Sequence, residues 1–351
     1  MATLTETAYY TRRTINWTIL GIIAYFILRL TWAILVFIYF ILFPPKPPPP
    51  NHAFGVLPKI QFPQSVSRPS DLKFRLETIE GTVPTASESA SVYFMPKSPA
   101  NLLALTRTQT FAQRLGLNPE PIQESKNIYI FKDPDLSLRT LRYDIVSNNF
   151  VLRYAYELDP LVFDQKNLPN DPKAITDAQS ILKGYNLYVN DYKNGTTRIT
   201  YLQLVGNKLL PILSRVEADA LRVDFFRKPI GDMKVFTADP DLGLINFLYS
   251  GNPNTIKQLM EFNYTYWPID YDTVGTYEMK RSQDAWQELV SGGGFIARYP
   301  RTGSTAVVRT MHLGYYDSYQ PQTYLQPIFV FEGDDGFLGY VPAVSLKWVE
   351  Q

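Results

Sequence analysis

The sequence predicts an α+β protein, in which an N-terminal transmembrane helix is followed by antiparallel β-meander modules, each preceded by a helix. Three observations predict this fold class. An apolar run of 29 residues occupies positions 15–43. Helix-start signals after residues 98, 171 and 282 are each followed by segments in which apolar and polar residues alternate, as in half-buried strands. Finally, 27 prolines, 19 glycines and 14% aromatic residues suit a strand-rich domain with many turns.

The composition of the 351-residue chain narrows the classes of function. Its net charge of +1 gives no basic surface of the kind that binds nucleic acid, so no nucleic-acid partner is expected. The chain has no cysteine, which removes disulfides, thiolate nucleophiles and cysteine metal sites together. Two histidines, His52 and His312, are too few for a multi-histidine metal site. We therefore expect no metal and no other cofactor.

Residues 15–43 are expected to form the transmembrane helix, after a short cytoplasmic tail of residues 1–14. The apolar character of the run is interrupted only by Asn16, Thr18, Arg29 and Thr31. As a helix the run would measure about 43 Å at ~1.5 Å per residue, against ~30 Å of bilayer hydrocarbon. A buried soluble helix rarely carries so much uninterrupted apolar surface. A cleaved signal peptide would be shorter and would end in small residues. An uncleaved signal-anchor helix is therefore the favoured interpretation.

The charges on the two sides of the run favour one orientation. Arg12 and Arg13 precede it, and Lys46 follows it. By the positive-inside rule, this bias leans toward an N-terminus in the cytoplasm and a C-terminal domain outside it. The expected location is the cell membrane, crossed once, with the lipid bilayer contacted through residues 15–43.

Arg29 stands in the middle of the apolar run and has two interpretations. An arginine at the centre of a membrane helix costs roughly 2.5–3.5 kcal/mol on insertion scales, so it would need an acidic or carbonyl partner from another membrane chain. Alternatively, the spanning part begins later in the run, and the Arg29 side chain extends to the cytoplasmic headgroups. The second interpretation is slightly favoured because the run is longer than the membrane requires, and the first stays open.

The segment PPKPPPP, at residues 44–50, ends the helix and begins a proline-rich spacer that we place at residues 44–51. Consecutive prolines form an extended polyproline II rod of ~3.1 Å per residue, which would hold the next domain ~20 Å from the bilayer. Binding of an SH3-type domain is the alternative, and the position beside a membrane makes the spacer the better interpretation.

Two α+β regions are expected after the spacer, at residues 52–170 and 171–351. The first contains short strands at Lys73–Glu77 and Ser91–Met95. Its helix is expected to start after Ser98-Pro99, a good N-cap and first-turn pair, and to end near residue 115, before Gly116.

The second region is expected to begin with a helix after Asp171-Pro172, which Gly184 closes. A further helix follows Ser282 and ends at SGGG, residues 291–294. Strands are expected at TTRITYLQL (196–204), MEFNYTYW (260–267) and VVRTMHLGYY (307–316). A hairpin over Tyr324–Val344 is expected to turn at Asp334-Asp335-Gly336, a strong short-range hairpin signal.

The last of these units resembles a known family. The segments AWQELVSGGGFIARYP, MHLGYYDSYQPQTYLQPIFVFEG and GFLGYVPAV are similar to the helix-plus-meander modules of PepSY-like proteins, and especially to the extracytoplasmic regulatory proteins YycI and YycH. In those proteins a helix of the type AW..L..G precedes a strand ending in GYY, and a YLQPVW-like strand leads into a final hairpin. The likeness covers about residues 277–351, and the N-terminal anchor agrees in layout. It implies a single-pass membrane protein whose outer domain binds partner membrane proteins and performs no catalysis.

The sequence contains no recognisable catalytic motif. It lacks a G-x-S-x-G elbow, a Walker loop, an H-E-x-x-H helix and a glycine fingerprint after a strand. Acidic pairs occur in KDPDL, in ADPDLG and in EGDDG, the last of which contains Glu332, Asp334 and Asp335. Paired carboxylates can hold calcium or hydrolyse glycosides. Asp-Pro-Asp and Asp-Asp-Gly are also ordinary turn sequences, and turns are the favoured interpretation.

Two aromatic-rich segments are candidates for a binding surface. One is FNYTYWPIDYD, which contains Trp267, and the other is YYDSYQPQTY. Tyrosine and tryptophan suit protein-docking and sugar-stacking surfaces, although alternating aromatics also fill the cores of sheets. The candidate partner-binding residues are Arg29, Trp267, Tyr315, Tyr316, Tyr319 and Tyr324.

We therefore expect a membrane-anchored scaffold or regulator of the bacterial cell envelope, held outside the cytoplasm, which binds other membrane or envelope proteins and is not an enzyme. One alternative is an envelope enzyme that uses acids such as Glu332 or Asp335. The other is a glycan- or peptide-binding sensor that uses the surface aromatics and acidic turns. An enzyme needs a cleft in which two titratable groups converge, whereas a scaffold needs an exposed apolar patch.

Overall fold

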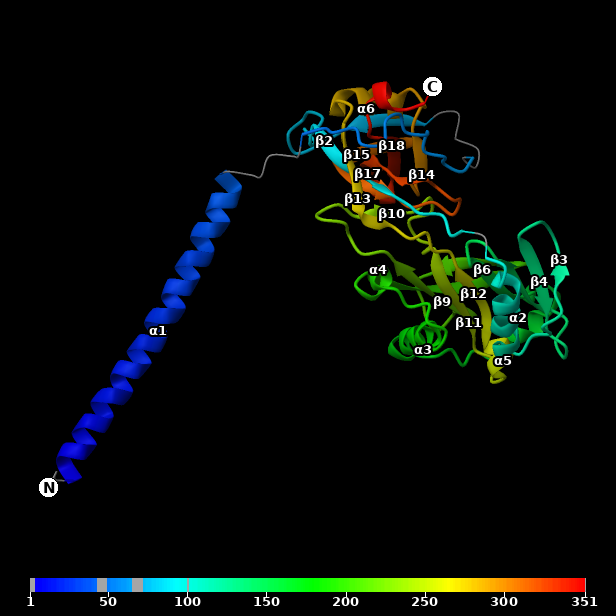
Figure 1. Cartoon of the computed structure of the whole chain (residues 1–351), viewed down its shortest axis with the longest axis horizontal. Helices are drawn as coiled ribbons and strands as arrows, with labels where there is room; N and C mark the ends of the chain where they lie inside the picture. The colour runs from blue at the N-terminus through cyan, green and yellow to red at the C-terminus, as the bar shows by residue number, and fades with distance from the viewer. Residues whose placement is uncertain (1–3, 43–48, 65–71, 100, 351) are drawn as a thin grey trace. The chain divides into compact units, whose positions relative to one another are not determined.

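The computed structural model of the protein describes residues 4–42, 49–64, 72–99 and 101–350 (Figure 1). The chain divides into two units, residues 1–48 and residues 49–351. The predicted fold class is confirmed, because an apolar N-terminal helix precedes an α+β unit whose sheets are mostly antiparallel. The predicted proline-rich spacer at residues 44–51 lies largely outside the described residues.

The first unit contains helix α1 (Leu4–Leu42), which is 39 residues long. The helix includes residues 4–14, which we expected as a tail before the membrane. Its stretch Arg12–Tyr39 is long and apolar enough to cross a membrane, and the described part of the chain buries none of it. Thr18 and Thr31 each donate their hydroxyl to the carbonyl four residues earlier, at 2.8 Å, so these polar groups are satisfied within the helix. The helix is compatible with a membrane anchor.

The second unit has two lobes, of which the nine-stranded lobe is built on one antiparallel sheet in the order β3-β4-β5-β6-β12-β11-β9-β7-β8. Its strands are β3 (Ile122–Gln123), β4 (Ile128–Lys132), β5 (Arg139–Asp144), β6 (Phe150–Tyr154), β7 (Thr196–Val205), β8 (Lys208–Ile212), β9 (Ala220–Phe226), β11 (Ile245–Ser250) and β12 (Leu259–Tyr264). Its helices are α2 (Ala104–Arg114), α3 (Asp171–Gly184), α4 (Asn190–Lys193) and α5 (Thr255–Gln258), with 3-10 turns at Tyr156–Leu158 and Pro160–Phe163.

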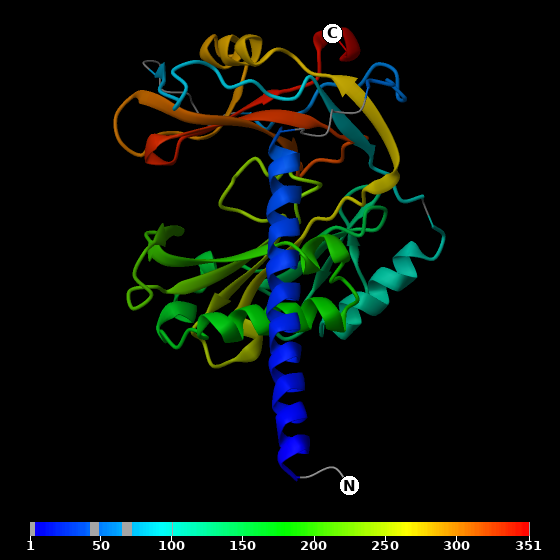
Figure 2. The ribbon, with the colours of Figure 1, turned by 90° about the vertical axis from the view of Figure 1, so that its left-hand side faces the viewer.

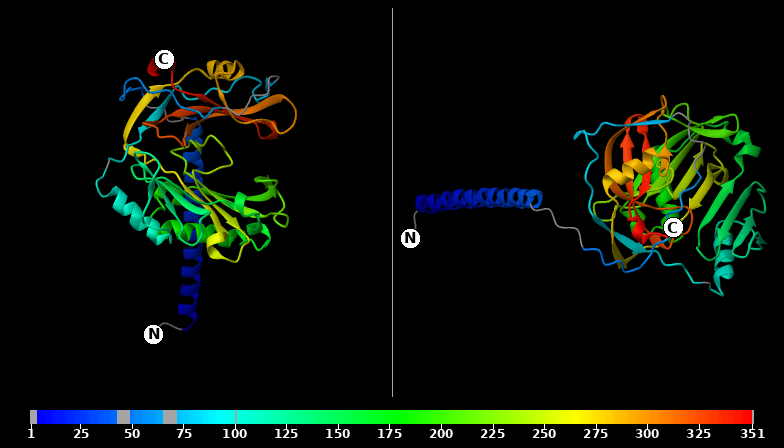
Figure 3. Two further views of the ribbon diagram at one scale, coloured as in Figure 1. Left: turned by 90° about the vertical axis from the view of Figure 1, so that its right-hand side faces the viewer. Right: turned by 90° about the horizontal axis from the view of Figure 1, so that it is seen from above.

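The six-stranded lobe holds a sheet in the order β1-β15-β17-β18-β14, in which β10 also pairs with β15, and a smaller sheet in the order β13-β2-β16. Its strands are β1 (Lys73–Leu76), β2 (Ser89–Phe94), β10 (Val235–Phe236), β13 (Asp270–Glu278), β14 (Phe295–Arg298), β15 (Thr305–Tyr316), β16 (Tyr324–Leu325), β17 (Pro327–Gly333) and β18 (Leu338–Pro342). Helix α6 (Ser282–Val290) covers this sheet on the side away from the nine-stranded lobe (Figure 3). The 3-10 turns are Asp334–Gly336 and Leu346–Trp348.

The chain passes between the two lobes four times, so neither lobe is a continuous segment. Two of these passages belong to one excursion, residues 227–243, which leaves β9, pairs with the six-stranded lobe through β10 and returns to β11 (Figure 2). The boundary expected at residue 170 falls inside the nine-stranded lobe. There β6 pairs with β12, with Phe150 opposite Tyr264. Strands from both sides of that boundary therefore share one sheet and one core.

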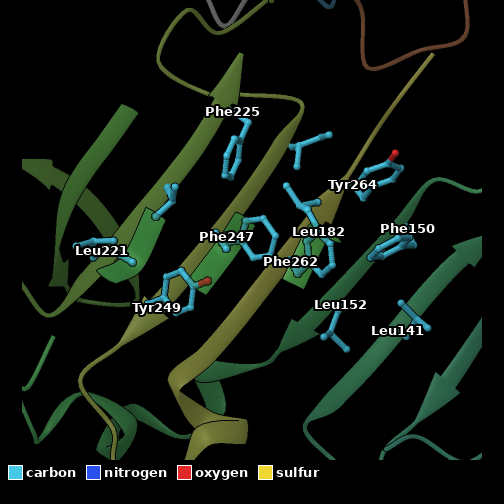
Figure 4. Close-up of a cluster of buried hydrophobic side chains, with 14 of the residues drawn as sticks. Leu141, Phe150, Leu152, Leu182, Leu221, Phe225, Phe247, Tyr249, Phe262 and Tyr264 are labelled. Atoms are coloured by element: carbon cyan, nitrogen blue, oxygen red, sulfur yellow. The ribbon is translucent and has the colours of Figure 1, made fainter. Parts of the chain in front are cut away.

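The core of the nine-stranded lobe lies between the sheet and helices α2 and α3, which pack on the same face of it. From α3 the core receives Ala174, Ala178 and Leu182, whose four-residue spacing places them on one side of the helix. From the sheet it receives Phe247 and Phe262, whose rings stack at 4.2 Å (Figure 4). Burial of a phenylalanine or leucine side chain stabilises the fold by roughly 1.5–3 kcal/mol.

Helix α3 begins where the sequence predicts, whereas the predicted start of α2 is wrong. The Asn170 side chain caps α3 by accepting the N–H of Lys173 at 2.9 Å. Helix α2 begins at residue 104 and not after Ser98-Pro99. The side chain of Asn101 accepts the N–H of Leu103 at 2.9 Å, a local turn that competes with helix formation. The helix therefore starts only after this turn.

The predicted hairpin is confirmed, with β17 and β18 joined at Asp334–Gly336. Asp335 and Gly336 have φ angles of 54° and 76°, both in the left-handed region, as in a type I′ turn. The predicted strands are also present as β1, β2, β7, β12 and β15. The unit that begins with α6 differs from the predicted meander in one detail. Its first strand, β14, pairs with β18 and not with the next strand, β15.

Replacing Gly336 with alanine is expected to lower the free energy of unfolding by about 1–2 kcal/mol, because a Cβ atom disfavours the left-handed conformation. The matched control is Gly184→Ala at the end of α3, where the backbone is helical and an added Cβ would meet no atom within 4 Å. The control should be neutral or more stable by up to ~1 kcal/mol. Urea denaturation measures both, and a Gly336→Ala protein as stable as the parent would contradict the turn.

Candidate binding site

The structure separates the candidate aromatic residues into core and surface. Tyr315 and Tyr316 are each 1% exposed, so they belong to the core of the six-stranded lobe and are closed to a partner. Tyr324 is half-buried in β16. Trp267 is also half-buried and Tyr319 is 36% exposed, and these two line the same groove. Of the aromatic candidates, Trp267 and Tyr319 therefore share one groove, and Tyr324 lies outside it.

Arg29 lies in α1, within the stretch that is apolar enough to cross a membrane, and its side chain is exposed. It forms no ion pair with a described residue. The sequence has no Asp or Glu between residues 7 and 70, so a second copy of this helix would offer Arg29 no carboxylate along that stretch.

The groove lies beside Trp267, between segments that are far apart in the sequence. Residues 144–149 form the turn between β5 and β6, residues 265–268 join β12 to β13, and residues 319–321 follow β15. The groove consists of two adjoining cavities of about 200 and 360 Å³ that share Asp144, Ser147, Trp267 and Pro321. The larger cavity has the volume of a small-ligand site.

The groove combines flat apolar surfaces with hydrogen-bonding groups. Its larger cavity is lined by Trp267, Tyr319 and Pro321 together with the polar side chains of Arg142, Asn149 and Gln320. The Oδ1 atom of Asn149 accepts the N–H of Tyr266 at 2.9 Å. The Nδ2 atom of Asn149 is buried and has no hydrogen-bond partner among the described residues. An unpaired buried donor costs about 1–3 kcal/mol, so this amide group is a local weak point in the wall of the groove.

Trp267 is held in place by two hydrogen bonds from different lobes. Its indole N–H donates to the carbonyl of Ser318, after β15, at 2.9 Å. Its own carbonyl accepts a hydrogen bond from the guanidinium of Arg227, at the end of β9, at 2.9 Å. Pro268 follows directly and restricts the backbone further. The position of the ring in the groove therefore depends on contacts from both lobes.

Arg227 is the centre of a buried ion cluster that joins the two lobes. Its Nε atom donates to Asp317, after β15, at 2.9 Å, and one of its terminal nitrogens donates to Asp191 of α4. The rings of Tyr192 and Tyr266 lie 5.6 and 5.2 Å from the guanidinium carbon, within the range of cation–π attraction. One guanidinium thus binds a carboxylate from each lobe.

Burial governs the electrostatics of the Arg227 cluster. It raises the pKa of the Asp317 carboxyl, and the attraction of Arg227 offsets only part of that rise. Burial also disfavours the charge of Arg227, but the attraction of Asp317 and Asp191 outweighs it and raises the pKa of the guanidinium. The hydroxyl of Tyr271 donates to Asp191 at 2.8 Å, and burial together with this bond raises its pKa. Arg227 therefore stays charged, and its attraction is the main offset to the burial of Asp317.

The acidic pairs of the sequence take part in local structure. Asp133 and Asp239 each accept the backbone N–H of the residue two positions later, at 3.0 and 2.9 Å, as in an Asx turn. Asp334 pairs with Arg309 at 2.6 Å. These contacts agree with the turn interpretation. Across the part of the chain that the structure describes, no three His, Cys, Asp or Glu side chains are grouped so as to hold a metal ion.

The two acids considered for catalysis also have partners. Glu332 lies 3.2 Å from Nε2 of His312, and Asp335 accepts a hydrogen bond from the hydroxyl of Thr302. Neither acid lines the groove beside Trp267. The enzyme interpretation therefore gains no support from the placement of these two carboxylates.

The comparisons with known proteins assign neither a family nor a function to this chain. No family model matches the chain, and no curated protein matches it. Among solved structures, the crystal structure of an uncharacterized protein from Eubacterium rectale is similar over 79% of this chain and 89% of its own, with 12% sequence identity and a TM-score of 0.38. A likeness at that TM-score supports no conclusion about this chain.

Trp267 and Tyr319 could be identified from the sequence, whereas the Arg227 cluster could not. Asp191 and Asp317 lie 36 and 90 residues from Arg227, and no motif connects the three. The one available signal is an arginine that directly follows the apolar stretch of a central strand, which is too common to indicate a site.

His312 is expected to titrate above its ordinary pKa of 6.5, because its hydrogen bond to Glu332 favours the imidazolium. Since the folded-state pKa of His312 is raised, the pair stabilises the fold fully only below about pH 6.5, and this contribution is lost as the pH rises through the folded-state pKa. The same hydrogen bond lowers the pKa of Glu332 from 4.5, so the contribution is also lost as the pH falls below about 4.5 and Glu332 is protonated. Both groups are partly exposed, so the contribution is about 0.2–1 kcal/mol.

Proton NMR of the histidine ring measures this pKa, and His52 is the only other histidine in the chain. Glu332→Gln should lower the pKa of His312, whereas Lys234→Gln should raise it, because the Lys234 ammonium opposes protonation. A pKa of His312 that does not respond to Glu332→Gln would contradict the pairing.

Proposed function

We propose that this protein is a single-pass membrane-anchored scaffold or regulator whose 49–351 unit lies outside the cytoplasm and binds other membrane or envelope proteins without catalysis. The observation that carries the proposal is the uncovered apolar surface of α1, where side chains such as Trp32 and Phe37 are 69% and 66% exposed. Contact of apolar surface with water costs roughly 25 cal/mol per Å², so this helix needs lipid or another protein around it.

The groove beside Trp267 supports a binding role for the 49–351 unit. Tryptophan and tyrosine supply large contact areas and are enriched among the residues that dominate binding energies. Because Trp267 is already fixed by two hydrogen bonds, a partner would not have to order it, which reduces the entropy lost on binding. The carboxylates of the enzyme alternative are engaged in turns and ion pairs, so binding is the better-supported function.

A glycan ligand is a second candidate for the groove. The unpaired Nδ2 of Asn149 and the guanidinium of Arg142 lie in the same lining as Trp267 and Tyr319. Sugar hydroxyls accept hydrogen bonds from such groups, and the apolar faces of sugar rings stack on aromatic side chains. This candidate predicts binding to isolated glycans without any co-purifying protein.

The orientation can be tested with single cysteines, because the chain has none of its own. We would compare Ser125→Cys, in the exposed turn between β3 and β4, with Ala2→Cys at the N-terminus. In intact bacterial cells whose outer barrier is permeable, a membrane-impermeant maleimide should label Ser125→Cys, and Ala2→Cys only after lysis. The opposite pattern would place the 49–351 unit in the cytoplasm.

The binding role can be tested by brief cross-linking of native membranes, gentle detergent extraction and mass spectrometry of the co-purifying chains. We expect one membrane or envelope protein in stoichiometric amount. Pro321→Trp, which fills the groove from a residue shared by both cavities, should reduce recovery of that protein severalfold. The matched control is Pro119→Trp, at an exposed proline outside the groove, which should leave recovery unchanged.

A chain that purifies alone would contradict the proposal, and binding of the same preparation to a glycan array would then favour the second candidate.

Arg29→Leu, in the same experiment, separates the two interpretations of Arg29. Recovery should be unchanged if the side chain only extends to the headgroups. Loss of the partner would indicate that Arg29 pairs with a carboxylate or a backbone carbonyl in a helix of that partner.

A further inference from the structure

The first half of β7 has a neighbouring strand on one side only. Strand β9 pairs with Thr196–Leu202, and on the other side β8 pairs only with Tyr201–Val205. Among the described residues, no strand, bridge or other backbone hydrogen bond occupies the β8 side of Thr196–Thr200. We call this free side of Thr196–Thr200, in line with β8, the β7 lane.

The β7 lane presents backbone groups that have no partner there. In an antiparallel strand every second residue directs both its N–H and its C=O to the same side. Five residues at ~3.4 Å each make the lane about 17 Å long. The outer edge of β8 is different, because it contains Lys208 and Pro211, residues that discourage strand addition. The lane residues, TTRIT, include neither lysine nor proline.

A cavity of about 490 Å³ adjoins the beginning of the β7 lane. One wall is formed by residues 196–198 of β7 together with Phe226 of β9, and the other by the excursion that carries β10 to the six-stranded lobe. The excursion contributes the apolar residues Pro229, Val235, Phe236 and Pro240. The volume is that of a typical ligand site, and the walls are largely apolar.

The cavity lining contains three cationic residues and no carboxylate. Arg227 is neutralised within its own cluster. Arg198 pairs with Asp241 at 2.8 Å, but Asp241 also pairs with Arg298, so one carboxylate serves two arginines. The Nε atom of Arg198 is buried and has no hydrogen-bond partner among the described residues. The side chain of Lys234 is exposed and forms neither a hydrogen bond nor an ion pair with a described residue, although its charge lowers the pKa of the nearby Glu332 carboxyl. The cavity therefore favours an anionic group.

We propose that the β7 lane and this cavity together bind an extended peptide segment of a partner protein, which adds a strand to β7 and places a carboxylate in the cavity. The inference rests on the proposed binding function and names the chemistry of one partner segment. Backbone hydrogen bonds along the lane supply affinity for any extended peptide, and the cavity supplies selectivity. The carboxylate belongs either to an acidic side chain or to the C-terminus of the peptide.

The test uses the full chain in lipid nanodiscs and two random libraries of N-acetylated hexapeptides. One library ends in a free carboxylate and the other in an amide, and the retained peptides are identified by mass spectrometry. We expect at least tenfold enrichment of peptides that are rich in β-branched or aromatic residues and carry a carboxylate. Retention from the free-acid library alone assigns the carboxylate to the C-terminus. Retention of Asp- or Glu-containing peptides from both libraries assigns it to a side chain.

Two further measurements locate the bound peptide. Lys234→Gln should weaken binding of the best peptide roughly three- to tenfold, because it removes a charge-assisted contact. Lys208→Gln, on β8 opposite Val205, is the matched control and should leave the affinity unchanged. Amide hydrogen exchange of Thr196–Thr200 should slow on binding, and exchange of the unbound variants shows that they are folded. No enrichment from either library, unchanged exchange in the lane, or equal affinity for Lys234→Gln would overturn the inference.

Failure of this inference is distinguishable from failure of the proposed function. If a membrane partner is recovered by cross-linking and lost with Pro321→Trp, but no peptide binds the β7 lane, only the inference falls. If peptides bind the lane but native membranes yield no partner protein, the chain is a peptide binder and the scaffold proposal falls.

Discussion

The 49–351 unit depends on a buried arginine held between two carboxylates. Arg227 directly follows β9, an interior strand of the nine-stranded sheet, while Asp191 belongs to the same lobe and Asp317 to the other. Removing one member of a buried ion cluster typically costs about 3–5 kcal/mol, because the remaining charges stay buried without a partner. Domains are stable by only about 5–15 kcal/mol in total. The relative position of the lobes is therefore sensitive to this one side chain.

Both proposed binding surfaces depend on that junction. Arg227 holds the carbonyl of Trp267, and this fixes the ring that lines the groove. Arg227 is also where the chain leaves the nine-stranded sheet for the excursion that forms a wall of the cationic cavity. A second ion cluster lies near the end of the excursion, where Asp241 pairs with Arg198 of one lobe and Arg298 of the other. The groove and the cavity thus both lie at the junction between the lobes and share the contacts of Arg227.

Local patterns predicted the elements well, and contacts distant in sequence account for what they missed. The DDG turn and the start of α3 depend on a few adjacent residues, so they could be read directly. Alternation failed for Tyr315 and Tyr316, which are consecutive and both buried, because β15 is a central strand covered on both faces. The shared sheet of β6 and β12 joins residues more than a hundred positions apart, and no local signal indicates it. Trp267 was found because it lies in a segment unusually rich in aromatic residues, whereas no local pattern indicates its hydrogen bond from Arg227.

The central claim is that the two lobes form one cooperative unit held together by Arg227. Hydrogen exchange measured by mass spectrometry along a urea titration of the full chain tests it most directly, with peptides from β11–β12 reporting one lobe and peptides from β17–β18 the other. The account predicts a single midpoint for both sets of peptides, and an earlier and divided transition for Arg227→Met. Two separate midpoints in the parent protein, or an Arg227→Met protein that unfolds like the parent, would contradict it.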